Sequence, residues 1–274
     1  MGKLEQRIGF IGGGNMARAI LGGMIKAGMA DGSRAAVSDV STDQLATIAA
    51  ETGAQTMTDN AGLVEKSDVI IIATKPFHVA DVCKEIGPDR AAGKLFISIC
   101  AGIKTQFIEE RLGPKARVVR VMPNTPALIG CGSTAVAGGA SASGADVELS
   151  LAIFRAVGIA IPLPEDQLDL VTGLTGSGPA YLFYFAESLI RAAEELGMAR
   201  ADATLLVKQL VYGAGRMAAE SDKSLDQLRT AVTTKKGTTE AGLLALEEGG
   251  FPDLIEECVA RATARSRELS AGII

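Results

Sequence analysis

A glycine-rich segment near the start of the sequence has the spacing of a dinucleotide-binding turn. Gly12-Gly13-Gly14-Asn15-Met16-Ala17 fits the pattern G-x-G-x-x-A, directly after the expected strand 7–11 and before the apolar helical pattern 17–27. In such a turn Gly12 permits the tight bend, Gly14 lets the backbone approach a pyrophosphate, and Ala17 lets the helix pack on the strand. Because strand, turn and helix come in the required order, we expect cofactor binding rather than a purely structural turn.

The end of the second expected strand carries an acid. Asp39 stands about 20 residues past the glycines, where a carboxylate accepts hydrogen bonds from the ribose 2′-hydroxyl and repels a 2′-phosphate, which favours NADH. Ser38, Ser41 and Thr42 are hydroxyl donors of the kind that hold a phosphate, so NADPH stays open as well. The alternative is that Asp39 only caps the helix that follows.

Three further segments follow expected parallel strands at 73–76, 100–103 and 122–126, where ligands bind in such sheets. Lys75 could reach a phosphate or ribose, or be a plain surface charge. Asn124 lies between two prolines, so its amide either orients a ligand or only shapes the turn. We expect His78, the single histidine, at a helix start rather than in a chemical role.

Two segments in the second half look like helix starts rich in small and hydroxyl-bearing residues. They are 175–181, with Ser177 between two glycines, and 237–240, which contains Thr238 and Thr239. Ordinary helix capping explains part of both patterns. Two helix N-termini together would also form a pocket of N–H and O–H donors suited to a small carboxylate.

The elements that position these residues change in character near residue 160. Before it, short β-rich runs alternate with helical patterns, and apolar runs such as 69–73 suit parallel strands covered on both faces. We therefore expect an α/β fold, with a doubly wound parallel Rossmann-type sheet over residues 1–160 and an all-helical domain over 161–274. The strands are expected at 7–11, 35–39, 68–74, 94–100 and 117–122.

The helical half has apolar stripes between Leu182 and Leu196 and between Leu254 and Leu269. They offer more apolar surface than a domain of about 110 residues readily covers, so we expect this half to pair with a second chain.

Composition excludes several classes of protein. With 274 residues, 47% hydrophobic and 22% charged, the chain is neither disordered nor of low complexity. A net charge of −5 argues against a nucleic-acid partner. No apolar run approaches the roughly 20 residues of a membrane span, so we expect a cytoplasmic protein without a membrane partner. Four scattered cysteines and one histidine offer no zinc cage, and a Ser-His-Asp triad would have to use His78.

Together these segments resemble pyrroline-5-carboxylate reductase, and the match runs through nearly the whole chain. It rests on Ile11 to Ala17, Lys75-Pro76, Ala101-Gly102-Ile103, Arg120 to Ala127, Gly176 to Tyr181 and Gly237-Thr238-Thr239. The Met-Pro-Asn-Thr-Pro and Gly-Ser-Gly-Pro-Ala-Tyr segments are specific to that family, whereas the glycine loop is not. The resemblance implies an NAD(P)H-dependent oxidoreductase of the CH–NH group that reduces 1-pyrroline-5-carboxylate to L-proline, the last step of proline biosynthesis.

The resemblance also implies the roles of individual residues. The pyrophosphate would be held by Gly12, Gly14, Asn15, Met16 and Ala17, and the adenosine end by Ser38, Asp39 and Asn60. Ala73, Lys75, Pro76 and Ala101 would border the nicotinamide half, with Asn124 also among the cofactor-binding residues. The substrate pocket would contain Ser177, Gly178, Thr238 and Thr239. The family forms intertwined dimers whose pockets take residues from two chains, and several members form decamers.

The resemblance implies a mechanism of positioning, because a cyclic imine needs only a hydride at carbon and a proton at nitrogen. Thr239 is the candidate catalytic residue: it either donates a hydrogen bond to the ring nitrogen, orients the imine, or relays a proton through water. The chain departs from the family at Lys235-Lys236, where Pro-Gly is usual. The exchange removes a residue suited to positive φ, and it adds two charges that could steer an anionic substrate.

Two rival functions differ from this one in testable ways. A β-hydroxyacid dehydrogenase has the same architecture but places a lysine one helical turn into the Gly-Ser-Gly helix, and residues 179–188 contain none. A nucleotide-sensing or scaffold protein would bind NAD(P) without turnover. Cofactor oxidation on addition of pyrroline-5-carboxylate distinguishes the sensor from the reductase.

Overall fold

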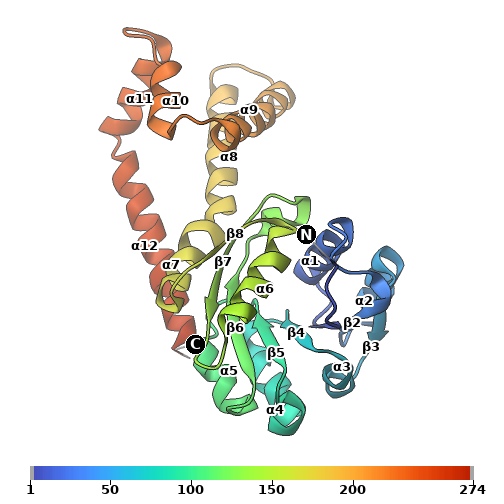
Figure 1. The fold of residues 1–274 in the computed structure, drawn as a ribbon. Helices are drawn as coiled ribbons and strands as arrows, with labels where there is room; N and C mark the ends of the chain where they lie inside the picture. The colour runs from blue at the N-terminus through green and yellow to red at the C-terminus, as the bar shows by residue number, and fades with distance from the viewer. Residues whose placement is uncertain (1–2, 272–274) are drawn as a thin grey trace. The chain divides into compact units, whose positions relative to one another are not determined.

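The structure is a computed structural model that describes residues 3–271. Its sheet has eight strands in the order β3-β2-β1-β4-β5-β6-β7-β8 (Figure 1). Within the described residues, every neighbouring pair is parallel apart from β6 and β7. The order of the first six strands is that of a dinucleotide-binding doubly wound sheet, so the expected fold class is confirmed.

Five strands form where the sequence predicts them, with ends that differ by one or two residues at most. They are β1 (Ile8–Ile11), β2 (Ala35–Ser38), β4 (Val69–Ile72), β5 (Leu95–Ser98) and β6 (Arg117–Met122). Their residues are almost all buried, because helices cover both faces of the sheet.

Three strands were not expected from the sequence: β3 (Gln55–Met57), β7 (Gly132–Gly138) and β8 (Gly158–Pro162). β3 is short and largely exposed, so it has no apolar run. β7 consists mostly of glycine, serine and alanine, which have low strand propensity. β8 lies at the edge of the sheet and ends at a proline, which edge strands tolerate.

Helices flank the sheet (Figure 1). With the sheet they form two separate apolar cores. One core packs α1 (Asn15–Lys26), α2 (Thr42–Thr52) and α6 (Gly144–Arg155) against the sheet. The other packs α3 (Asn60–Lys66), α4 (Val79–Ala91) and α5 (Thr105–Leu112) against the opposite face. Successive side chains along a strand point to opposite faces of the sheet, so each strand can contribute residues to both cores.

The chain divides into two compact units. The nucleotide-binding unit runs through Ser177 and includes the segment from Arg261 onward, and the helical unit is Gly178–Ala260. The expected boundary at 160/161 instead falls inside β8, which pairs with β7 in the sheet. α7 (Leu168–Val171) also belongs to the nucleotide-binding unit, because Leu168 packs against β7.

The helical unit contains four helices and the first part of a fifth: α8 (Gly178–Glu195), α9 (Arg200–Glu220), α10 (Leu225–Ala231), α11 (Thr238–Glu248) and α12 (Phe251–Ser270). Large apolar side chains on α8 and α9 remain exposed within a single chain: Leu182, Phe183, Tyr184, Leu205, Leu206, Leu210 and Tyr212. A surface of this kind is typical of helices that pair with another chain. Of the helices in residues 3–271, none is both long and apolar enough to cross a membrane.

Candidate active site

A cavity of about 650 Å³ lies along the carboxyl ends of the parallel strands. The loops after β1, β2, β4, β5 and β6 each contribute to its lining, as expected for the crevice where such sheets bind ligands. The lining includes most of the expected cofactor residues: Gly12, Gly14, Asn15, Met16, Ser38, Asp39, Asn60, Ala73 and Lys75.

The glycine loop between β1 and α1 leaves open space where a pyrophosphate would lie. Gly12 has φ +101°, and a Cβ there would lie 2.7 Å from the carbonyl oxygen of Ala73, so only glycine fits. At Gly14 the nearest atom to an added Cβ would be Gln44 Oε1 at 3.8 Å. Gly14 therefore faces unfilled space, and the loop fits a dinucleotide.

The N-terminus of α1 borders the same open space and, with the glycine loop, forms a cradle for a pyrophosphate. The N–H of Arg18 donates the first bond of the helix to the Gly14 carbonyl at 3.0 Å, which leaves the N–H groups of Asn15, Met16 and Ala17 without a partner inside the helix. Such N–H groups, at the positive end of a helix dipole, bind phosphate oxygens. Ala17 itself is fully buried beneath the loop, where its small side chain lets α1 approach the sheet.

Asp39 holds the glycine loop as well as facing the cavity. Its Oδ2 accepts a hydrogen bond from the N–H of Gly13 at 2.7 Å, and its Oδ1 accepts one from the N–H of Ser41 at 2.8 Å. The cap of α2 is Ser41, whose Oγ accepts from the N–H of Gln44. The alternative that Asp39 caps this helix is therefore wrong, and its carboxylate links the first two strand ends.

A chain of hydrogen bonds fixes Asn60 at the same end of the cavity. The Ser38 hydroxyl donates to Asn60 Oδ1 at 2.6 Å, and Asn60 Nδ2 donates to Glu85 Oε2 at 2.7 Å. The N–H of Asn60 also donates to Glu85 Oε1 at 3.2 Å. Glu85 lies on α4 and lines the cavity, yet nothing in the sequence marks it, because its helical position resembles that of any surface acid.

The loops after β4, β5 and β6 contribute unequally to the lining. Lys75, Ile99 and Pro123 line the cavity, whereas the expected residues Pro76, Ala101 and Asn124 are not among its lining residues. His78 lines the cavity and also stands at the N-cap of α4, so the expected helix start is confirmed.

The amide of Asn124 is used by the protein. Its Oδ1 accepts from the N–H of Ser133 at 2.8 Å, and its Nδ2 donates to the carbonyl of Thr175 at 3.1 Å. Asn124 is 8% exposed, so these two bonds satisfy a largely buried side chain. Of the two alternatives left open by the sequence, the geometry favours a residue that shapes the turn.

The segment around Ser177 differs from the expected helix start. α7, a π-helical turn at Thr172–Gly176 and α8 follow one another directly. The N–H of Ser177 donates to the Thr172 carbonyl at 2.9 Å, so this donor is occupied by the helix that precedes it. The N–H of Ser177 is therefore not available to a ligand. The expected donors that remain at this segment are the Ser177 hydroxyl and groups of the neighbouring residues.

The start of α11 agrees better with the expectation. Gly237 is its N-cap, and no side chain among the described residues caps it. The first bond of the helix runs from the N–H of Ala241 to the Gly237 carbonyl, which leaves the N–H groups of Thr238 and Thr239 outside the helical pattern. Both threonines are exposed.

The replacement of the family's usual Pro-Gly by Lys235-Lys236 affects the backbone conformation of the loop before α11. Lys236 adopts φ +57°, a left-handed conformation that suits glycine. Its N–H donates to Glu240 Oε2 at 2.6 Å, a bond across the first turn of α11. The lysine is therefore held in a conformation with a small strain cost.

Cys100, at the end of β5, is no candidate nucleophile. Burial raises the pKa of its thiol to about 11, and its Sγ lies 3.3 Å from the carbonyl oxygen of Thr74. A thiol of this kind stays protonated at neutral pH and acts as a small packing residue.

The fold and the cavity define a Rossmann-type dinucleotide-binding protein with a separate helical unit. Over 97% of this chain, a pyrroline-5-carboxylate reductase from Methanosarcina acetivorans is 40% identical, and the match covers 98% of that protein. One from Pseudomonas aeruginosa is 38% identical over 96% of this chain and 97% of its own length. The chain therefore belongs to the pyrroline-5-carboxylate reductase family, as its motifs predicted.

Solved structures and family models agree with this assignment. A pyrroline-5-carboxylate reductase from Coxiella burnetii has a TM-score of 0.92 at 40% identity, covering 97% of this chain and 99% of its own. A Plasmodium falciparum pyrroline carboxylate reductase with NADP bound has a TM-score of 0.85 at 30% identity, covering 98% and 100%. Residues 165–269 match the model for pyrroline-5-carboxylate reductase dimerisation, and residues 7–102 match the one for NADP oxidoreductase, coenzyme F420-dependent.

Proposed function

We propose that this protein is an NAD(P)H-dependent reductase that converts 1-pyrroline-5-carboxylate to L-proline, the last step of proline biosynthesis. The observation that carries the proposal is the open cradle at Gly14, in a cavity at the carboxyl ends of the parallel strands of a chain that belongs to this family. Both NADH and NADPH are candidate cofactors, because the cavity combines the carboxylate of Asp39 with neighbouring hydroxyl groups.

The glycine loop and the first turn of α1 would hold the pyrophosphate. Ser38, Asp39 and Asn60 would face the adenosine ribose, and the residues after β4, β5 and β6 would border the nicotinamide half. When bound, a reduced nicotinamide dinucleotide supplies the hydride for the imine carbon. The protein's own contribution is then to orient the two reactants and to exclude competing geometries.

The substrate carboxylate would bind at the N-terminus of α11, where the N–H groups of Thr238 and Thr239 are free of helical bonds. Ser177 and Gly178 are the other residues proposed for the pocket. The Thr239 hydroxyl would donate a hydrogen bond to the ring nitrogen. A neutral hydroxyl is a weak acid, so its role is to orient the imine and to pass on a proton from water.

The helical unit would form an intertwined homodimer, and dimers of this family can assemble further into decamers. Support for self-association comes from the match to the dimerisation model and from the exposed apolar residues of α8 and α9. Each substrate pocket would then take residues from two chains.

The test is cofactor oxidation by the purified protein, followed at the nicotinamide absorbance band. We expect oxidation of NADH or NADPH when 1-pyrroline-5-carboxylate is added, with proline formed in equal amount. A short-chain β-hydroxyacid with NAD⁺ serves as the control for alcohol oxidation and should give no turnover, since α8 contains no lysine to act as base. Protein that binds both cofactors yet turns over neither with the imine would be a nucleotide sensor, and the proposal would be wrong.

A further inference from the structure

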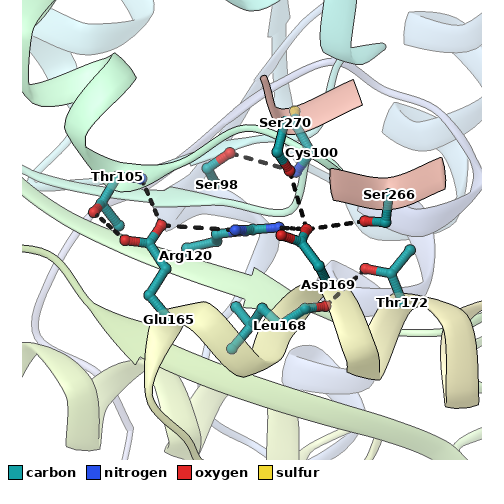
Figure 2. A network of polar contacts seen from close by, with 10 residues as sticks. All are labelled: Ser98, Cys100, Thr105, Arg120, Glu165, Leu168, Asp169, Thr172, Ser266 and Ser270. Atoms are coloured by element: carbon teal, nitrogen blue, oxygen red, sulfur yellow. Dashed lines mark hydrogen bonds and ion pairs between the residues drawn. The ribbon is translucent and has the colours of Figure 1, made fainter. Parts of the chain in front are cut away.

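A buried polar network lies near the ends of β5 and β6 (Figure 2). Arg120 falls within the family motif 120–127, but the sequence assigns no role in the site to any residue of the network. Its centre is Arg120 on β6, whose side chain is almost wholly buried. Arg120 Nη2 donates to Asp169 Oδ1 at 2.9 Å, and Nη1 lies 3.8 Å from Glu165 Oε1. A guanidinium in this position requires a buried partner, and α7 supplies it through Asp169.

Asp169 also holds the end of α12. The same Oδ1 atom accepts hydrogen bonds from the hydroxyls of Ser266 at 2.9 Å and Ser270 at 3.0 Å (Figure 2). Burial opposes ionisation of Asp169, but the bonds from Arg120 and Ser266 outweigh it and keep the pKa of this carboxyl below its ordinary value. Within the nucleotide-binding unit, the C-terminal turns of α12 are thus bonded to α7 through one carboxylate.

The contacts of Asp169 with α12 are one arm of the network. The second arm is formed by Glu165 and reaches the start of α5. Glu165 accepts hydrogen bonds from the N–H and the hydroxyl of Thr105, at 2.7 and 2.8 Å. It caps this helix in place of Lys104, the N-cap residue, which makes no capping bond of its own. Both arms therefore end next to the segment 100–104 that links β5 to α5.

The end of α12 packs directly on that segment. Gly102 has φ +74°, and a Cβ there would lie 3.2 Å from Leu269 Cβ and 3.3 Å from the backbone nitrogen of Ser270. Ile99, which immediately precedes the segment, lines the cavity, and so does Pro123, three residues after Arg120. Among the strands whose ends line the cavity, β5 and β6 lie farthest from Asp39, and the network holds the ends of these two.

We propose that Asp169 is a positioning residue for hydride transfer. By holding the end of α12 against Gly102, it fixes the cavity wall formed by the ends of β5 and β6, along which the nicotinamide half of the cofactor lies. The proposal rests on the proposed function, and Asp169 is not among the residues that line the cavity. Its action passes through Ser266 and Ser270 to the segment 100–104.

The sharpest test removes the two serine hydroxyls and keeps the buried ion pair. Ser266→Ala with Ser270→Ala leaves Arg120 paired with Asp169, so the charge stays compensated and the protein should fold. We expect single-turnover hydride transfer to slow by about tenfold, since two hydrogen bonds to a carboxylate are lost from a positioning contact. The dissociation constant of NADH should rise by about threefold or more, while that of ADP-ribose, which lacks the nicotinamide, should stay within twofold.

The matched control lies on the same turns of α12. Arg265→Ala with Glu268→Ala removes an exposed ion pair and should leave hydride transfer and both dissociation constants unchanged. Ser270→Thr with Ser266 intact keeps both hydroxyls and should behave as the unmodified protein. If the double serine variant does not fold, Ser270→Ala alone is measured in the same way, with a smaller expected effect in the same direction.

Two results would overturn the proposal. One is a folded serine variant with unchanged hydride transfer and unchanged NADH affinity. The other is an equal loss of NADH and ADP-ribose binding, which would indicate general damage to the unit. The ratio of the two dissociation constants needs no turnover, so it tests the positioning role even if the proposed reduction itself were not observed.

Discussion

In the nucleotide-binding unit Phe10, Phe96 and Phe154 are fully buried, whereas in the helical unit Phe183 and Tyr184 are each more than 60% exposed. The first unit covers its apolar residues on both faces of a sheet, within one chain. The second leaves long apolar faces on α8 and α9 without cover from its own chain. The contrast teaches that the cavity proposed for the cofactor is lined within one chain, while the helical unit offers an apolar surface for a partner to cover.

The most severe test of this contrast is to charge the exposed face of α9. Leu206→Glu with Leu210→Glu puts two carboxylates on one side of the helix. An unpaired buried charge costs on the order of 3 kcal/mol or more, so we expect the dimer dissociation constant to rise by more than about a hundredfold. Sedimentation velocity measures this, with Ile129→Glu on the nucleotide-binding unit as the matched exposed control. Unchanged self-association of the α9 variant would place the interface elsewhere.

The second test blocks the cradle and leaves the helical unit alone. Gly14→Val puts a side chain into the space expected for the pyrophosphate, and we expect cofactor affinity to fall by at least about a hundredfold. The fold should survive, because an added Cβ meets no atom closer than 3.8 Å. Gly22→Ala on the same helix is the control, since its Cβ meets nothing within 4 Å. Normal NADH titration of Gly14→Val would contradict the assignment of the loop.

The third test asks what the helical unit contributes to the chemistry. Thr239→Ala removes one neutral hydrogen bond and keeps the N–H groups at the start of α11. The loss of about 1 kcal/mol or somewhat more predicts a fall in turnover of about ten- to a hundredfold, with substrate still bound.

Thr239→Val keeps the branched shape and should behave in the same way. A collapse of about a thousandfold or more in both variants, measured as single-turnover rate against pH, would instead make the hydroxyl a true proton donor. Wild-type rates in Thr239→Val would show that the hydroxyl has neither role.

The fourth test separates the two functions of Asp39. Asp39→Ser removes the charge and the acceptor for Gly13, while Asp39→Asn removes the charge and keeps an acceptor oxygen. If the carboxylate repels a 2′-phosphate by about 1 kcal/mol, both variants should raise the ratio of NADPH to NADH activity by about fivefold. Asp39→Ser should in addition weaken binding of both cofactors. If the ratio of kcat/KM for NADPH to that for NADH stays constant, the only remaining function of Asp39 is to hold the glycine loop through Gly13.

The smallest expected effect lies in the loop before α11. Lys236→Gly relieves the left-handed conformation at this position and should raise the free energy of unfolding by up to about 1 kcal/mol. Lys235→Gly is the matched control, because among the described residues Lys236 is the non-glycine residue with positive φ. Thermal unfolding should show a rise of about 2 °C for the first variant and a small fall for the second.

The sequence predicted those parts of the molecule whose signal is local. The apolar run at β4 and the glycine loop before α1 stand out without any tertiary information. β7 was missed because its small residues acquire strand structure only by pairing with β6 and β8.

In the candidate site, too, the sequence predicted only the residues whose signal is local. Gly12, Gly14 and Asp39 were found from spacing, whereas Glu85 was not. Asn60 and Glu85 are 25 residues apart and on different helices, and only the packing of α3 against α4 brings the amide and the carboxylate together. The same holds for Arg120 and Asp169, which are 49 residues apart. Contacts of this range carry no periodic signal in the sequence.

The attachment of α12 to Asp169 has a consequence for the order in which the protein folds during synthesis. Asp169 and Ser266 are 97 residues apart, so the sheet emerges from the ribosome well before the residues that cover its buried ion pair. Contacts between such distant residues close late, and domains otherwise fold as they are made. The Arg120–Asp169 pair in the nascent sheet therefore stays incompletely covered until the final turns of α12 have left the ribosome.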